Sequence, residues 1–263
     1  MPNLQTGKYW DEGAMVVDGC TKVSLGCQNC WSLQMTKRRK PKDILSENGQ
    51  EWSGFIRYNK DRLFQAVKGK PKVISLWNDL YHEAVPDSVI VAVHDAMAGF
   101  MSHKFMVLTK RPARMADIWR RFCVAVWGNV WNGTTCENQE MADLRIPQLL
   151  QVPGHKWVSI EPILGPVDIW KSAYQPGWSS EKTDGKGITW FVVGPETGPK
   201  RRECDPAWIK SVVDQCTAAG VPVWVKAFPV PAWANIKTGE SKDRISHDMN
   251  EWPVWARRRE LPW

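Results

Sequence analysis

Six short apolar runs recur along the chain, and stretches with a helical pattern separate them. The runs are rich in β-branched and aromatic residues, which predicts buried strands. The predicted strands are Val73–Leu76 and residues 105–108, 129–131, 156–160, 190–193 and 221–225. Helices are expected at residues 88–101, 111–121, 140–150 and 205–219. This alternation favours an α/β fold with a parallel sheet, as a complete or partial (β/α) barrel. An open doubly wound sheet is the alternative.

Polar residues follow every predicted strand. They come from the segments Trp77-Asn78-Asp79, Thr109-Lys110-Arg111, residues 132–138, Glu161-Pro162, residues 194–198, and Lys226. In parallel α/β folds the carboxyl ends of the strands meet at one edge and carry the active site. Because the pattern repeats after each strand, we expect one shared site at the mouth of the barrel.

Three of the seven cysteines are crowded near the N-terminus in the spacing C-x6-C-x2-C: Cys20, Cys27 and Cys30. Three thiolates can bind three irons of a [4Fe–4S] cluster and leave the fourth iron open to an exchangeable ligand. Zinc is the alternative, and it requires a fourth ligand such as Cys204 or a histidine. Three unrelated buried thiols are a further alternative. Disulfides are not expected in a reducing compartment.

The cysteine loop is one of several recognisable segments. In order, the chain contains GCTKVSLGCQNCW, SLWNDLYHEAVPD, VLTKRPARM, NVWNGTTCEN, VSIEPILGPVD, VVGPETGPKRR and DQCTAAGVPVWVKAF. Together these segments resemble the phage and bacterial three-cysteine-motif family, which is described as radical-SAM-like and is largely of unassigned function. The resemblance covers roughly residues 16–228. It departs from the family's pattern at Trp31, where tyrosine is more usual, and at Pro195, where glycine is expected.

The resemblance implies an architecture for the whole chain. We expect a single domain over residues 1–263, a barrel of the radical SAM type with an N-terminal Fe–S cluster loop. The cluster loop would span about 16–32, the barrel about 70–228, and a Trp/Arg-rich tail 229–263.

The resemblance also implies a [4Fe–4S] cluster that binds and cleaves S-adenosylmethionine (SAM), so that a 5′-deoxyadenosyl radical abstracts hydrogen from a substrate. By their positions after strands, Asn78 and Asp79 would bind the amino group of SAM. Lys110 or Arg111, beside Thr109, would bind its carboxylate. The ribose hydroxyls would be bound by Ser159 and Glu161. The structural alternatives are an Asp79–Lys110 salt bridge and a buried Glu161 bonded to the backbone. An external electron donor such as flavodoxin is the expected redox partner.

Three further residues are candidates for the substrate side of the site. Glu196 and Lys226 follow the later strands, and the thiol of Cys136 could donate hydrogen to a product radical. A lone cysteine at the end of a strand is more often a small packing residue.

The chain carries a formal net charge of +7, which suits a polyanionic partner. The basic run at residues 37–42, the Arg-rich tail and the 17 tryptophans favour a nucleic-acid partner. The phage members of the family that the chain resembles imply a modified base in DNA as the substrate, with isomerisation or hypermodification as the expected reaction. A radical SAM enzyme acting on a peptide or small metabolite is one alternative. A zinc-stabilised, non-enzymatic nucleic-acid-binding protein is another. The tail could equally pack its tryptophans on the barrel.

No stretch has the ~20 apolar residues that span a bilayer, and the first residues lack a signal-peptide pattern. We therefore expect a cytoplasmic protein without a membrane partner.

Overall fold

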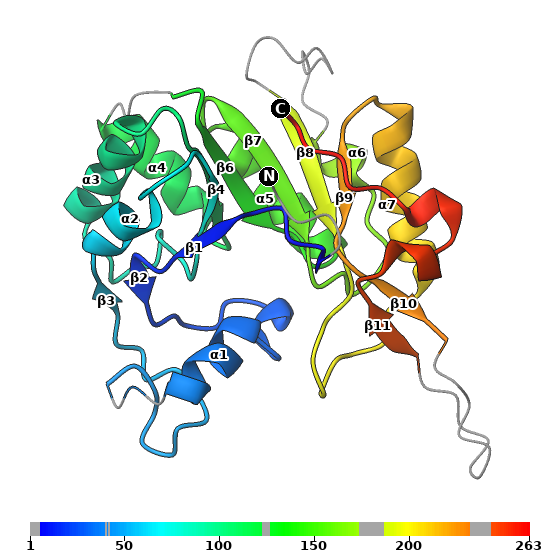
Figure 1. The fold of residues 1–263 in the computed structure, drawn as a ribbon, viewed down its shortest axis with the longest axis horizontal. Helices are drawn as coiled ribbons and strands as arrows, with labels where there is room; N and C mark the ends of the chain where they lie inside the picture. The colour runs from blue at the N-terminus through cyan, green and yellow to red at the C-terminus, as the bar shows by residue number, and fades with distance from the viewer. Residues whose placement is uncertain (1–5, 40, 42, 123–126, 174–186, 232–242) are drawn as a thin grey trace.

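A curled, seven-stranded parallel sheet forms the centre of the molecule (Figure 1). The computed structural model describes residues 6–39, 41, 43–122, 127–173, 187–231 and 243–263. The strands, in their order across the sheet, are β1 (Glu12–Ala14), β4 (Val73–Leu76), β5 (Lys104–Thr109), β6 (Val130–Thr135), β7 (His155–Ile160), β8 (Ile188–Val193) and β9 (Val223–Val225). Their order follows the chain without the reversal that a doubly wound sheet has. The α/β class is confirmed, and the sheet is a half-barrel with β1 and β9 at its edges.

All six predicted strands are present, within a few residues of their expected ends. Strand β1 was not expected, and it pairs with β4 in parallel register, Glu12 beside Ile74. The expected barrel span of residues 70–228 therefore leaves out the first strand of the sheet. A three-residue strand with the sequence EGA has no apolar run by which a pattern could find it.

Helices join the strands and cover the sheet. They are α2 (Asp61–Ala66), α3 (Asp87–Ala98), α4 (Pro112–Phe122), α5 (Gln139–Leu150), α6 (Ile169–Ala173) and α7 (Pro206–Ala218). Helix α7 shows why such segments form. The Asp205 side chain caps it by accepting from Ala207 N, and Gly220 follows its end with a φ of +64°. Its buried residues are spaced as one helical face, at Ile209, Val212, Val213 and Cys216.

Four tryptophans fill the inside of the curled sheet, one from each of four neighbouring strands. They are Trp131, Trp157, Trp190 and Trp224, and each is at most 4% exposed. The ring of Tyr9 packs edge-on against three of them. The expectation that abundant tryptophan serves nucleic-acid binding is wrong for these four, because they are core residues.

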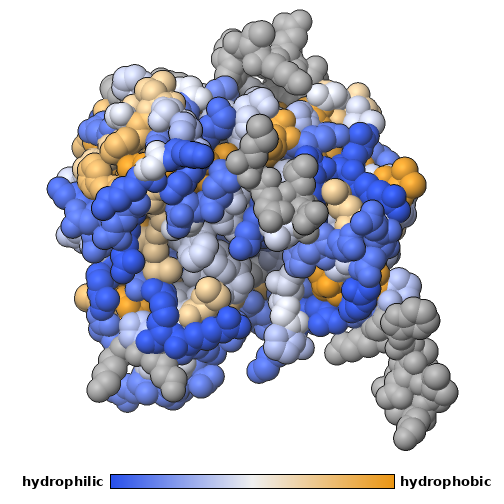
Figure 2. Space-filling view, viewed as in Figure 1, coloured by the Kyte–Doolittle hydropathy of each residue, from blue (hydrophilic) through white to orange (hydrophobic). Residues whose placement is uncertain are grey.

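Most of the chain between β1 and α2 forms a separate lobe below the sheet in Figure 1. In it, β2 (Val17–Asp18) pairs antiparallel with β3 (Arg57–Tyr58). Between these strands lie the short helix η2 (Leu25–Cys27) and α1 (Trp31–Arg39). The expected cluster loop, about 16–32, runs from β2 to the start of α1. Hydrophilic residues cover much of this lobe in Figure 2. Residues 40 and 42 of the basic run lie outside the described residues.

The C-terminal tail packs on the sheet. Strand β10 (Phe228–Val230) pairs antiparallel with β11 (Arg244–Ser246), and η3 (Met249–Glu251) and η4 (Val254–Ala256) follow. The backbone then returns to β9, where Val225 N donates to Arg258 O at 2.8 Å. At the end of the chain, the Trp263 ring lies 5.1 Å from that of Trp131. Of the two expectations for the tail, packing is the one observed.

Much of the insertion before β8, residues 174–186, lies outside the described residues. Within the described part of the chain, no helix has the length and apolar character needed to cross a membrane.

Candidate functional site

A cavity of about 360 Å³ lies at the carboxyl edge of the sheet, between the ends of six strands and the cysteine loop. Its volume falls in the range of small-molecule sites. Twelve of the thirteen site residues predicted from the sequence line it: Cys20, Cys27, Cys30, Asn78, Asp79, Thr109, Lys110, Arg111, Ser159, Glu161, Glu196 and Lys226. Residues far apart in the sequence therefore meet in one place, as the repeated polar ends of the strands predicted.

The three cysteines come from one side of the cavity. Cys27 ends η2 and Cys30 directly precedes α1. Burial raises the pKa of Cys20 to about 12, and the neighbouring Asp79 carboxylate and the other two thiols add to the effect. Burial also raises the pKa of Cys30, although the Lys110 ammonium opposes the shift. Neutral thiols are thus the preferred form of these two cysteines in the protein without a metal.

Among the described residues that line the cavity there is neither a fourth cysteine nor a histidine. In the described part of the chain, no three His, Cys, Asp or Glu side chains are grouped as the ligands of a single metal ion would be. Cys204, the fourth zinc ligand considered above, is 9% exposed and does not line the cavity.

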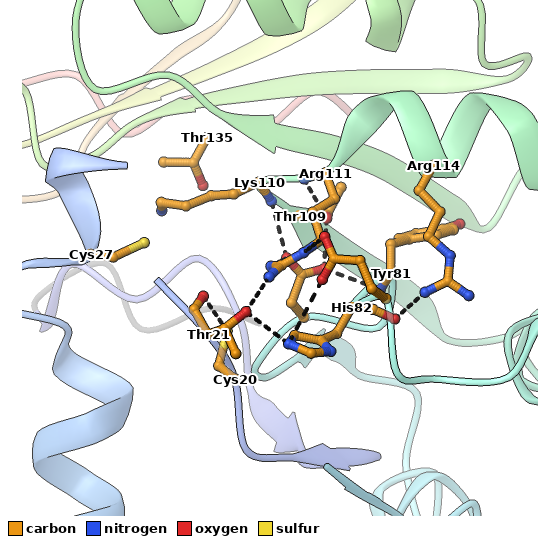
Figure 3. Close-up of polar contacts among 12 residues, drawn as sticks. Cys20, Thr21, Cys27, Tyr81, His82, Thr109, Lys110, Arg111, Arg114 and Thr135 are labelled. Atoms are coloured by element: carbon orange, nitrogen blue, oxygen red, sulfur yellow. Dashed lines mark hydrogen bonds and ion pairs between the residues drawn. The ribbon is translucent and has the colours of Figure 1, made fainter. Parts of the chain in front are cut away.

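Both carboxylate oxygens of Asp79 accept hydrogen bonds from the protein itself, among them bonds from Thr109 and Arg111, which Figure 3 labels. Oδ1 accepts from the Thr109 hydroxyl at 2.6 Å and from Tyr81 N at 3.0 Å. Oδ2 accepts from Arg111 Nη1 at 2.8 Å and from Lys110 N at 3.3 Å. These four bonds fill the acceptor capacity of a carboxylate. The salt bridge considered for Asp79 and Lys110 is replaced by one between Asp79 and Arg111.

Arg111 connects this carboxylate to the cysteine loop. Its Nη2 donates to the Thr21 hydroxyl at 2.7 Å, one residue after Cys20, and its Nε donates to Glu83 at 2.7 Å. The Thr21 hydroxyl also lies 2.9 Å from His82 Nε2. Arg111 therefore fixes the start of the loop against the ends of β4 and β5.

The side chain of Lys110 turns away from Asp79 and pairs with Glu137, 3.3 Å from Oε1. Glu137 is only 1% exposed and is also paired with Arg145 at 3.0 Å. Burial alone would raise the pKa of the Glu137 carboxyl, but Lys110, Arg145 and the Ser24 hydroxyl hold it below its ordinary value. Glu137 is therefore a buried, ionised group.

Glu161 and Lys226 form another ion pair, with 3.2 Å between Oε1 and Nζ. The Ser159 hydroxyl donates to Glu161 Oε2 at 3.2 Å. Lys226 Nζ also lies 5.5 Å from the centre of the Trp10 ring. The alternative of a Glu161 bonded to backbone is not what the structure shows, and this pair retains acceptor and donor capacity toward the cavity.

Asn78 joins the end of β4 to the cysteine lobe. Its Nδ2 donates to Val17 O at 2.9 Å, and its Oδ1 accepts from the hydroxyl of Ser32, the second residue of α1. The backbone has a φ of +63°, a region that asparagine tolerates better than most residues. Asn78 therefore supports the lobe that carries the cysteines.

Cys136 is the one predicted site residue that does not line the cavity. It is fully buried in the main hydrophobic core. Burial raises the pKa of its thiol, and its position is that of the small packing residue considered as the alternative.

Four residues of the network that holds the cysteine loop were not predicted from the sequence: Asn29 in the loop, Glu137 and Arg202, which contact it, and Arg145, which pairs with Glu137. Glu137 belongs to the polar segment after β6, so its place at the end of a strand could have identified it as a site residue. Arg145 and Arg202 lie in a helix and a loop, where an arginine is ordinarily a surface residue.

A protein family model described as "Protein of unknown function (DUF5131)" matches residues 6–252. No curated protein and no solved structure matches the chain.

Proposed function

The chain belongs to the DUF5131 family of proteins of unknown function, and we propose that its cavity is the active site of a radical SAM enzyme. One observation carries this proposal. All three cysteines of the C-x6-C-x2-C motif line a cavity that also receives the carboxyl ends of six parallel strands. A ligand at the cysteines would therefore face the polar side chains at the ends of the strands.

The donor set fits a [4Fe–4S] cluster. Thiolates are soft ligands that suit iron–sulfur clusters, and each cysteine binds a different iron, so the sulfurs need not surround one ion. Three cysteines without a fourth cysteine or a histidine among the described lining residues would leave one iron for an exchangeable ligand. When bound, the cluster supplies the electron that cleaves SAM and produces the radical that abstracts hydrogen from the substrate.

The residues of the cavity divide into two groups for this role. Asp79 and Thr109 are occupied with Arg111 and the backbone, and Asn78 is occupied with the cysteine lobe, so we assign them to holding the site in shape. The other three candidates, Lys110, Ser159 and Glu161, can still donate or accept hydrogen bonds toward the cavity. We assign the carboxylate of SAM to Lys110 and its hydroxyl or amino groups to Ser159 and Glu161.

The charge of the cavity bears on the substrate. Its lining has three acidic residues, Asp79, Glu161 and Glu196, and three basic ones, Lys110, Arg111 and Lys226. Such a balanced site favours a neutral or zwitterionic ligand and gives no excess of positive charge for phosphates. A DNA substrate would therefore place an uncharged base in the cavity and its phosphates outside.

The lobe around the cysteines can bind those phosphates. Residues 16–62 contain nine Lys and Arg against five Asp and Glu, a surplus of four positive charges. Beside the cavity, Trp31 is 50% and Leu25 66% exposed. Aromatic and basic side chains together favour an unstacked nucleotide. Following the family resemblance, we propose a modified base in DNA as the substrate and isomerisation or hypermodification as the reaction.

The deciding experiment is anaerobic reconstitution with iron and sulfide, followed by reduction in the presence of SAM. We expect iron and sulfide to bind and 5′-deoxyadenosine to form, with more product when DNA containing a modified base is present. Protein that takes up zinc and no iron would contradict the proposal. Equal turnover with a free nucleoside or a peptide would leave the radical chemistry standing and overturn the DNA substrate.

A further inference from the structure

Two carboxylates from the ends of the strands contact the two ends of residues 24–29, the segment that contains Cys27. Glu137, after β6, accepts from the Ser24 hydroxyl at 2.7 Å. Glu196, after β8, accepts from Asn29 Nδ2 at 2.9 Å. Both carboxylates are nearly buried, at 1% and 5% exposed. Each contact joins residues more than a hundred positions apart, so only the folded half-barrel can bring them together.

Glu137 also lies directly against the backbone of the segment. A Cβ added at Gly26 would be 2.3 Å from both Cγ and Oε1 of Glu137. Only glycine allows this approach without displacing the carboxylate. The carboxylate is therefore in van der Waals contact with the residue that precedes Cys27.

Both carboxylate oxygens of Glu196 accept hydrogen bonds from other residues of the protein. Its Oε2 accepts from Asn29 Nδ2, from Arg202 N at 2.8 Å and from Arg202 Nε at 3.0 Å. Arg202 in turn donates from Nη1 to Leu25 O at 3.1 Å. The candidate catalytic residue Glu196 thus joins the loop after β8 to both ends of η2, through Asn29 and Arg202.

The Ser24 hydroxyl lies between two acceptors. Its oxygen is 2.7 Å from Glu137 Oε1 and 3.9 Å from Cys27 Sγ. A hydroxyl has one proton, and the nearer, ionised carboxylate is the stronger acceptor. The proton of Ser24 is therefore directed to Glu137 and away from the sulfur.

We propose that Glu137 and Glu196 are positioning residues that hold Cys27 at the cavity wall before any metal is bound, and that Glu137 keeps the Ser24 hydroxyl from donating to the Cys27 sulfur. Hydrogen bonds and charges around cluster ligands set the reduction potential. The bond between Ser24 and Glu137 thus fixes the loop, and it also keeps the reduction potential of a bound cluster low. Only this second effect rests on the function proposed above.

The first test uses metal-free protein and does not depend on the cluster. Ser24→Ala removes the bond to Glu137, and Asn29→Ala removes the bonds from Nδ2 to Glu196 and to Lys200 O. Both variants leave the buried carboxylates paired with their cations. We expect the rate of Cys27 alkylation by iodoacetamide, followed by mass spectrometry, to rise at least about fivefold in each variant, because losing a hydrogen bond shifts a local opening equilibrium by about that factor. Asp87→Asn, which breaks the pairs with Arg114 and Arg121 outside the cavity, is the control and should match the wild type. Unchanged alkylation in both variants would overturn the positioning role.

The second test measures the midpoint potential of the reconstituted protein. Glu137→Gln removes a negative charge next to Cys27, and we expect a less negative potential. Ser24→Ala should leave the potential unchanged, because the hydroxyl does not donate to the sulfur. A more negative potential in Ser24→Ala would show that the hydroxyl does bond Cys27 and would overturn this part of the proposal. If the wild type binds no cluster, the proposed function fails while the alkylation result still decides the positioning role.

Discussion

The guanidinium of Arg111 lies 2.8 Å from the Asp79 carboxylate in the wall of the cavity, and both side chains are less than a tenth exposed. Because Arg111 also donates to Thr21, this pair couples the ends of β4 and β5 to the loop that begins at Cys20. An ion pair of this kind is costly to break from one side, since the remaining charge stays buried.

Asp79→Asn should therefore lower the free energy of unfolding by about 3 kcal/mol, because the buried Arg111 then keeps only the exposed Glu83 as an ion-pair partner. Urea denaturation of the metal-free protein measures this. Asp117→Asn, which breaks the exposed pairs with Arg120 and Arg121, is the matched control and should change stability by less than about 1 kcal/mol. Equal effects of the two variants would mean that Asp79 is not a structural anchor.

Each of the three cavity cysteines should be required for iron binding. Cys20→Ala, Cys27→Ala and Cys30→Ala are expected to lose most of the iron and sulfide taken up on anaerobic reconstitution, because each removes the ligand of one iron. Cys204→Ala should retain the wild-type content, since Cys204 does not line the cavity. Metal analysis and the visible absorption spectrum report the result. Loss of metal in the Cys204 variant would instead support the four-ligand zinc site.

Stability should fall as the pH is lowered, in part through His94. Burial lowers the pKa of His94 to about 4, and its Nε2 lies 2.7 Å from the Tyr81 hydroxyl. Between the ordinary value of about 6.5 and about 4, the unfolded chain binds a proton that the folded chain does not. The neutral His94 therefore makes its full contribution to the free energy of unfolding above a pH of about 6.5. This contribution, up to about 3 kcal/mol, is lost as the pH falls toward about 4. His94→Gln should show a shallower loss of stability over this pH range in urea titrations. Identical slopes would exclude His94 as a source.

Gly133 in β6 should not tolerate a side chain, because a Cβ there would lie 2.4 Å from Trp157 Nε1. The indole is fixed, since it donates to Val107 O and Trp131 O, both at 3.2 Å. We expect Gly133→Ala to cost about 2 kcal/mol in chemical denaturation, as overpacking of a core does. Gly165→Ala is the control, because nothing lies within 4 Å of its added Cβ. A neutral Gly133→Ala would show that the tryptophan layer can shift.

DNA binding, if it follows the proposed function, should depend on α1 and not on the C-terminal tail. Replacing Lys37 and Arg38 by alanine should weaken binding and reduce the slope of log affinity against log salt by about two, because each cation that neutralises a phosphate contributes about one. Replacing Arg257 and Arg258 should change little, because the tail packs on the sheet and Arg258 is paired with Glu260. Binding measured by fluorescence anisotropy at several salt concentrations distinguishes the two. A weaker affinity in the tail variant alone would place the DNA at the other end of the molecule.

The sequence alone determined the elements that local patterns specify. Apolar runs such as VISL at β4 predicted the strands, the Asp205-Pro206 start predicted α7, and the polar residues after each strand predicted the cavity. These features depend on residues close together in the chain, whose periodicity and capping chemistry are visible in order.

Only the tertiary structure decided which charges pair and which aromatic residues are buried. Asp79 is paired with Arg111 and not Lys110, Lys110 reaches Glu137, and the tryptophans of β6 to β9 fill the half-barrel. Strand β1 joins the sheet because β4 supplies its hydrogen-bonding partner, not because of its own sequence. Side-chain pairing and burial depend on contacts between distant segments. Where several cations could reach one carboxylate, only the packing of the folded chain decides which of them forms the ion pair.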